Sequence, residues 1–209
     1  MNTPIPFIDG IKQFKEHYFK EHKSLFKELS EKGQSPRALF IGCSDSRVIP
    51  NLITSAKPGD LFIVRNIGNM VPPFKPDEDF HGTAAAIEYA VSVLNVEDII
   101  VCGHSQCGAC RALYENIEGD ELIHVKKWLE LGKEAKEKAL STKVSSDEEL
   151  FNLTEKLNVI SQLKNLLTYP GVKRRVEDGT LRLHGWHYNI STGDIYVFNP
   201  EKNQFEKID

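Results

Sequence analysis

Two short apolar runs constrain the fold of this chain most, because a candidate metal ligand follows each of them directly. Cys43 follows the run over 38–42, and His104 follows the run over 98–103. Apolar runs of this length are typical of buried strands, and the carboxyl ends of parallel strands meet at one edge of an open sheet. We therefore expect Cys43 and His104 to lie close together at that edge.

Cys107 supplies a third candidate ligand, three residues after His104. Segment 107–114 has the pattern of the first turns of a helix, where free backbone N–H groups favour a thiolate. Two thiolates and one imidazole suit tetrahedral zinc, and a site with three protein ligands leaves the fourth position to water, as in catalytic zinc sites. The sequence therefore predicts a zinc site formed by Cys43, His104 and Cys107.

Asp45 decides what fills the fourth position of such a site. It lies two residues after Cys43 and can reach the same metal, whereas Arg47 has the planar fork that binds a carboxylate through two hydrogen bonds. If Arg47 holds Asp45, zinc keeps a water whose pKa falls to about 7, which provides a hydroxide nucleophile. If Asp45 binds the metal, the site is closed and inactive. Because hydroxide is scarcer at low pH, we expect activity to rise with pH across the neutral range.

The other cysteines allow different interpretations. Cys107 and Cys110 match the C-x-x-C pattern of redox exchange, and Cys110 also has the helical spacing that would complete a closed Cys3His structural site. The spacing from His104 and the upstream motif at Cys43 favour a metal site over redox exchange. Cys102, inside an apolar run, is expected to be a small buried side chain.

The two motifs resemble the paired pattern of the β-class carbonic anhydrases, C-x-D-x-R followed by H-x-x-C. The similarity extends from about residue 30 to the end of the chain, and its further landmarks are Gln34-Ser-Pro36, Val71-Pro-Pro, 82–90 and His184-Gly-Trp186. The resemblance implies reversible hydration of carbon dioxide to bicarbonate and a proton by a zinc-bound hydroxide. It also implies that Asp45 accepts a hydrogen bond from this hydroxide, that Arg47 fixes Asp45, and that no organic cofactor is required.

Within the family the chain is similar to the plant-like type, in which a Gln, a Phe and a Tyr line the carbon dioxide pocket at a subunit boundary. By position these residues are Gln34, Phe62 and Tyr89, and we place Gly103 with them as a substrate-binding residue. The type with a bicarbonate effector pocket has a Trp three residues before the first zinc cysteine, where this chain has Phe40. The resemblance also implies a homodimer or a multiple of dimers, because the N-terminal arm wraps a neighbouring subunit.

Two other functions remain open from the sequence. The same scaffold and hydroxide would hydrolyse carbon disulfide or carbonyl sulfide, which are also linear and apolar. A noncatalytic zinc-stabilised binding or redox-sensing module would instead keep Cys110 or Asp45 permanently in the fourth position, and it would bind zinc without turnover.

The hydrophobic pattern predicts a single α/β domain over 1–209 that begins with a helical arm over 1–33. Apolar residues recur at helical spacing in the arm, and a mainly parallel sheet flanked by helices follows, with an antiparallel hairpin at its C-terminal edge. The expected elements are a strand over 61–65, a helix over 82–94, a strand over 98–102, a helical region over 120–168 and a hairpin over 181–198. Within the helical region Ser145 or Ser146 is expected as a cap before Asp147, and Pro170-Gly171 is expected to end it.

Two kinds of polar residue in the expected strands have more than one interpretation. His184 and His187 are three residues apart in an alternating pattern, which places them on opposite faces of a strand rather than in a second metal site. Arg65, at the end of an apolar run, either reaches solvent or pairs with a buried carboxylate.

Composition limits the partners and the location. A net charge of -4 and a pI near 6.0 give no general attraction to nucleic acid, and the basic cluster over 173–175 is short. Four unevenly spaced cysteines do not resemble a disulfide framework and fit a reducing cytoplasm. Neither a secretion signal nor an apolar run of membrane-spanning length is visible, so we expect a cytoplasmic protein without membrane or nucleic-acid partners.

Overall fold

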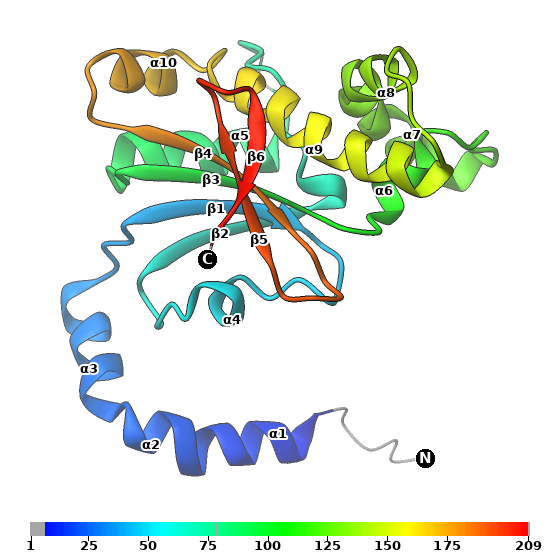
Figure 1. Ribbon diagram of the computed structural model, residues 1–209. Coiled ribbons are helices and arrows are strands. Elements are labelled where there is room, and N and C mark those ends of the chain that lie inside the picture. The colour runs from blue at the N-terminus through cyan, green and yellow to red at the C-terminus, as the bar shows by residue number, and fades with distance from the viewer. Residues whose placement is uncertain (1–6, 78, 209) are drawn as a thin grey trace. The chain divides into compact units, whose positions relative to one another are not determined.

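The computed structural model describes residues 7–77 and 79–208, and the chain divides into two compact units after Ser35. Residues 1–6, with which both the predicted arm and the predicted domain begin, therefore lie outside the described residues. We describe each unit by itself (Figure 1).

The N-terminal unit is helical, as the sequence predicts. Its elements are α1 (Ile8–Gln13), a π-helical turn (Phe14–Tyr18), α2 (Phe19–Glu21) and α3 (Lys23–Lys32). Phe26 packs against Phe14 and Phe19, with ring centroids 6.1 and 5.0 Å away. None of the described residues of this unit is buried, so local aromatic packing holds these helices together.

The second unit contains a six-stranded sheet in the order β2-β1-β3-β4-β5-β6. The strands are β1 (Ala38–Cys43), β2 (Leu61–Asn66), β3 (Asp98–His104), β4 (Arg182–Tyr188), β5 (Ile195–Asn199) and β6 (Gln204–Lys207). The first four strands pair in parallel, and β5 pairs antiparallel with both of its neighbours. The predicted mixed sheet and its closing hairpin are confirmed, whereas β6 was not predicted.

Every residue of β1 and β3 is buried, which explains why their sequences are continuous apolar runs rather than alternating ones. The helices are α4 (Pro50–Thr54), α5 (Gly82–Glu88) with its π-helical extension (Tyr89–Val93), α6 (Gly108–Ala112), α7 (Ile123–Leu129), α8 (Lys133–Leu140), α9 (Asp147–Leu166) and α10 (Pro170–Glu177). Short 3-10 turns lie at Ile67–Asn69, Asp120–Leu122 and Glu130–Gly132.

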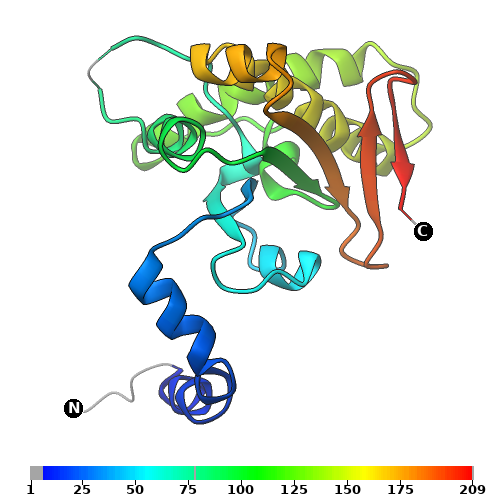
Figure 2. The same ribbon diagram turned by 90° about the vertical axis from the view of Figure 1, so that its left-hand side faces the viewer.

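The main core lies between one face of the sheet and the helices α5, α9 and α10 (Figure 2). Leu39 and Val101 of the strands pack there with Ile87, Val159 and Val172 of the helices.

None of the helices in the described residues combines the length and the apolar character needed to cross a bilayer.

The helical region expected over 120–168 is interrupted between α8 and α9, and the predicted cap before Asp147 is confirmed. Ser146 Oγ accepts the N–H of Glu149 at 3.2 Å at the start of α9. α9 ends at Leu166, but the helical region continues past its expected end, because Pro170 opens α10 as its first residue. Proline lacks an N–H that the first turn of a helix leaves unpaired anyway, so it is tolerated at this position.

Helix α9 lies unusually close to the sheet where it crosses β3 and β4. A Cβ atom on Gly103 would lie 2.7 Å from Val159 Cγ2, and one on Gly185 would lie 2.9 Å from Val159 Cγ1. These two glycines therefore let the helix approach the strand that carries the candidate histidine ligand.

Candidate metal centre

The register of β1 and β3 brings the first two candidate ligands together. Gly42 lies opposite Cys102 in the parallel ladder, so Cys43 and His104 follow at the same carboxyl edge of the sheet. The expectation drawn from the two apolar runs is confirmed.

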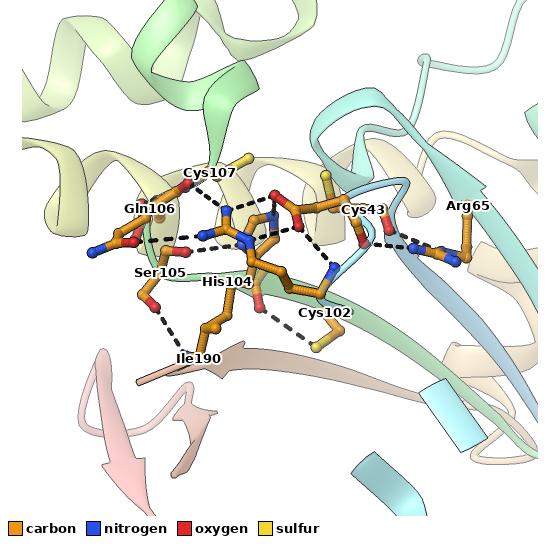
Figure 3. Close-up of polar contacts among 12 residues, drawn as sticks. Cys43, Arg65, Cys102, His104, Ser105, Gln106, Cys107 and Ile190 are labelled. Carbon is orange, nitrogen blue, oxygen red and sulfur yellow. Dashed lines mark hydrogen bonds and ion pairs between the residues drawn. The ribbon is translucent and has the colours of Figure 1, made fainter. Parts of the chain in front are cut away.

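Cys107 joins them through a tight turn. Gln106 has a left-handed backbone with φ 57°, and the chain then enters α6 with Cys107 as the residue before its first turn. The sulfur atoms of Cys43 and Cys107 and a ring nitrogen of His104 lie within 4.8 Å of one another, and all three side chains are buried (Figure 3). The predicted ligand set is thus assembled as a candidate metal site.

The histidine is oriented for metal binding. His104 Nδ1 lies 2.9 Å from the carbonyl oxygen of Ser105, and a carbonyl only accepts, so Nδ1 carries the proton. Nε2 is buried and has no hydrogen-bond partner among the described residues. An unpaired buried nitrogen is costly unless a cation binds it, so the donor set fits zinc.

The two thiols hold their protons in the absence of a cation. The pKa of Cys43 is raised to about 12, first by its hydrogen bond with Cys107 and then by burial. The pKa of Cys107 is raised as well, chiefly by its hydrogen bond with Cys110. Metal binding there must displace both protons. Cys110 is buried beside Cys107 but does not belong to the set of three converging ligands, and Cys102 is a buried thiol as expected.

Asp45 is turned toward Arg47. Arg47 donates Nε–H to Oδ1 at 2.9 Å and Nη2–H to Oδ2 at 2.7 Å, which is the predicted two-bond arrangement. The hydrogen bonds of Arg47 hold the pKa of the Asp45 carboxyl well below its usual range, although partial burial opposes the shift. Asp45 Oδ2 still lies 3.9 Å from His104 Nε2. The carboxylate therefore borders the ligand cluster without belonging to it.

Two arginines fix the loops that carry these groups. Arg47 Nη2 also donates to the carbonyl of Gln106 at 3.2 Å. Arg65 Nε donates to the carbonyl of Cys43 at 3.0 Å, and its Nη2 donates to the carbonyl of Asp45 at 2.6 Å (Figure 3). Arg65 is exposed, as one of its two expected roles requires, and its donors bind backbone carbonyls at the end of β1 rather than a carboxylate.

The expected substrate residues are only partly brought together. Phe62 and Tyr89 stack with their ring centroids 5.9 Å apart. Gly103 lies in β3 under Val159, which gives it a packing role whatever else it does. Gln34 belongs to the N-terminal unit. The role of these four residues in substrate binding stays a prediction.

Sequence reasoning missed a buried carboxylate next to the ligands. Glu155 of α9 accepts the backbone N–H of Cys107 on Oε1 at 3.0 Å, and its Oε2 lies 2.9 Å from His187 Nε2. His184 contacts Asp98 at 2.8 Å, which leaves the two histidines on opposite faces of β4, as expected. Glu155 lies 48 residues after Cys107, so no local motif connects them. Its spacing of four residues before the buried Val159 was the one available signal.

Comparison with known proteins gives consistent matches. A family model described as carbonic anhydrase matches residues 38–195. A carbonic anhydrase from Pseudomonas aeruginosa is 42% identical over 198 residues, which is 95% of this chain and 89% of that protein.

Two solved structures share the fold over most of their length. The β-carbonic anhydrase CcaA has a TM-score of 0.90 at 42% identity, over 97% of this chain and 90% of that one. A chain from the tetrameric β-carbonic anhydrases of Sordaria macrospora has a TM-score of 0.80 at 29% identity, over 92% and 94%. The matched region contains the whole candidate metal centre.

Proposed function

This chain belongs to the β-class carbonic anhydrase family, and on that premise we propose that Cys43, His104 and Cys107 hold its zinc ion. The protein is an enzyme that catalyses the reversible hydration of carbon dioxide to bicarbonate and a proton, with zinc as its cofactor. The observation that carries the ligand assignment is the buried Nε2 of His104, unpaired in the described structure and grouped with two thiols.

We propose that Asp45 orients the attacking water. A zinc ion held by the three ligands would supply a water acidic enough to act as a nucleophile near neutral pH. Because Arg47 occupies both carboxylate oxygens, Asp45 is kept beside the ligand cluster as a hydrogen-bond acceptor and away from the metal position. This arrangement leaves the fourth position to water, as a catalyst requires, and it argues against a closed noncatalytic site.

The substrate pocket is proposed to follow the plant-like type. The stacked rings of Phe62 and Tyr89 offer an apolar wall for an uncharged linear molecule. Gln34 would donate a hydrogen bond to a substrate or product oxygen, and Gly103, near the end of β3, is placed with these residues. Phe40, buried where the other type has Trp, supports this assignment.

We further propose a single-domain enzyme over 1–209 with a helical arm over 1–33, assembled as a homodimer or a multiple of dimers. The tetrameric enzymes of Sordaria macrospora support an assembly of this kind. The exposed apolar side chains of the arm, such as Ile11 and Phe14, support a role in contacts between subunits. The four free cysteines support a reducing compartment, the cytoplasm.

The ligand assignment is tested by comparing Cys43→Ser with Cys102→Ser. Both cysteines are buried, but only Cys43 belongs to the ligand cluster. A hydroxyl is a poor zinc ligand beside a thiolate, so Cys43→Ser should lose zinc and carbon dioxide hydration together. Cys102→Ser should keep one zinc per chain. Full zinc content in the purified Cys43→Ser protein would contradict the assignment.

A further inference from the structure

We propose that Glu155 is a positioning residue of the metal centre, which fixes the ligand Cys107 through its backbone N–H, and that His187 fixes Glu155 in turn. The inference rests on the proposed role of Cys107 as a zinc ligand. It concerns the long-range contact between α9 and the end of the ligand turn.

Cys107 is the ligand that the sheet does not hold. Cys43 and His104 lie in fully buried strands with ladder partners on both sides. Cys107 lies beyond the sheet, after the left-handed residue Gln106 and before the five-residue helix α6. A helix of this length is not stable by itself, and the N–H of the residue before it has no partner within the helix. The position of Cys107 therefore depends on tertiary contacts.

Each residue of the turn between His104 and α6 is fixed by a different part of the fold. The N–H of Ser105 donates to the carbonyl of Tyr188 at 2.8 Å, and Ser105 Oγ accepts the N–H of Ile190 at 2.9 Å. Figure 3 shows this contact of Ser105 with Ile190. Arg47 binds the carbonyl of Gln106. The contact that reaches the N–H of Cys107 itself comes from Glu155, at 3.0 Å.

Glu155 is built into a rigid position. Its side chain is 2% exposed, and α9 is held against the sheet one turn later, where Val159 touches the positions of Gly103 and Gly185. Both carboxylate oxygens have donors, Cys107 N–H on Oε1 and His187 on Oε2. Burying a carboxylate is costly unless it is hydrogen-bonded. A carboxylate is also a stronger hydrogen-bond acceptor than a neutral group, which suits a role in fixing the N–H of Cys107.

His187 is dedicated to this carboxylate. It is 1% exposed in β4, and Nε2 lies 2.9 Å from Glu155 Oε2. Its other nitrogen, Nδ1, has no hydrogen-bond partner within the described residues. A carboxylate only accepts, so Nε2 is the donor and the ring holds the Glu155 carboxylate toward Cys107.

The chain offers a matched control on the same helix. Gln162 lies seven residues after Glu155, is also buried, and accepts the backbone N–H of Val71 on Oε1 at 2.8 Å. Val71 is not a ligand. Replacing either residue by Met removes a buried acceptor from a backbone N–H, but only Glu155→Met removes it from a ligand.

The experiment measures zinc affinity and zinc dissociation by competition with a chelator, on the full chain. Removing an outer-shell partner of a metal ligand typically costs about 10–100-fold in affinity, and we expect a loss in that range for Glu155→Met. Gln162→Met should bind zinc as the parent does while it unfolds more easily. In the cobalt-substituted protein, the thiolate-to-cobalt absorption bands should shift for Glu155→Met and not for Gln162→Met.

Two conservative variants keep the test valid if Glu155→Met does not fold. Glu155→Gln retains an acceptor at the same reach and should keep the parent's zinc affinity and cobalt spectrum. Glu155→Asp retains the charge but withdraws it from Cys107, and it should lose affinity. Parent-like affinity for Glu155→Met or Glu155→Asp, or an equal loss for Gln162→Met, would overturn the proposal.

Failure of this inference is distinguishable from failure of the ligand assignment. If the parent binds no zinc, or if Cys107→Ser keeps zinc, the ligand assignment is wrong. If Cys107→Ser loses zinc while every Glu155 variant binds it like the parent, only the positioning role is wrong.

Discussion

Replacing Arg47 by Ala should abolish most of the activity without removing the metal. Arg47 is the residue that turns Asp45 away from the ligand cluster, whose nearest nitrogen, His104 Nε2, is 3.9 Å from Asp45 Oδ2. Without the Arg47 side chain, the backbone N–H of residue 47, 3.0 Å from Oδ1, is the one remaining donor from that residue. Asp45 Oδ2 then has no guanidinium partner, and the carboxylate can rotate toward the metal position and fill the place that water needs. The three ligands are unchanged, so zinc should be retained.

The size of the effect follows from the two hydrogen bonds of Arg47. A hydrogen bond to a charged group contributes about 1.5–3 kcal/mol, and the 43% exposure of the Arg47 side chain favours the lower end of this range. Two bonds then hold Asp45 in place by about 3 kcal/mol, which corresponds to a loss of activity of about 100-fold. Asp45→Ala should lose a similar factor, and Arg47→Lys should lose less, because lysine keeps the charge without the fork.

Arg182 provides a matched control for the assay. It donates Nε–H to Asp98 Oδ1 at 2.7 Å and Nη2–H to Asp98 Oδ2 at 2.9 Å, in the same two-bond geometry, but at the opposite end of the sheet. Stopped-flow hydration of carbon dioxide and zinc content should be measured for both variants. Arg182→Ala should lower the free energy of unfolding and leave turnover unchanged.

The reasoning is refuted if Arg47→Ala turns over at the parent's rate with zinc bound. It is also refuted if Arg47→Ala loses zinc, because Arg47 would then support the ligands themselves rather than the orientation of Asp45. Equal losses of turnover in the Arg47 and Arg182 variants would show a general effect of losing a surface ion pair.

Three other variants or treatments extend the test. Asp98→Asn should cost about 2 kcal/mol of stability at pH 7. Hydrogen bonds from Arg182 lower the pKa of Asp98 from 3.8 to about 2, although burial opposes this shift with a smaller effect. This stability is complete above pH 4 and is lost as the pH falls toward 2, so acid titrations of the parent and the variant should converge there. Gln34→Ala should reduce turnover and leave zinc content unchanged, and loss of zinc would show that Gln34 supports the ligands. Chelation of zinc should abolish activity and lower the melting temperature, both restored by adding zinc; an unchanged melting temperature would contradict binding at the buried cluster.

The candidate ligand set could be predicted from the sequence because local patterns indicate it. Buried strands have continuous apolar sequences, and Cys43 and His104 each lie at the end of such a run. The ends of two parallel strands meet at one edge of the sheet, so the two residues were expected to lie close together. The Asp45 and Arg47 pair was also predictable, because the two residues are close in sequence and their geometry is complementary.

The sequence did not show contacts between distant segments. Glu155 reaches Cys107 across 48 residues, and the backbone carbonyls at the end of β1 that bind Arg65 have no sequence signature. The role of Pro170 was mispredicted for a different reason: a proline is common both after the end of a helix and at the first position of one, and here it opens α10. Long-range contacts and helix breaks depend on tertiary packing, which is difficult to predict from a single sequence.

The most direct test of the proposed catalytic centre is stopped-flow carbon dioxide hydration with zinc measured in the same sample, at about pH 7 and about pH 8.5. We expect one zinc per chain and fast turnover that is faster at the higher pH, because water must lose a proton before it attacks. One zinc per chain with no hydration at either pH would contradict the catalytic role of the centre formed by Cys43, His104 and Cys107.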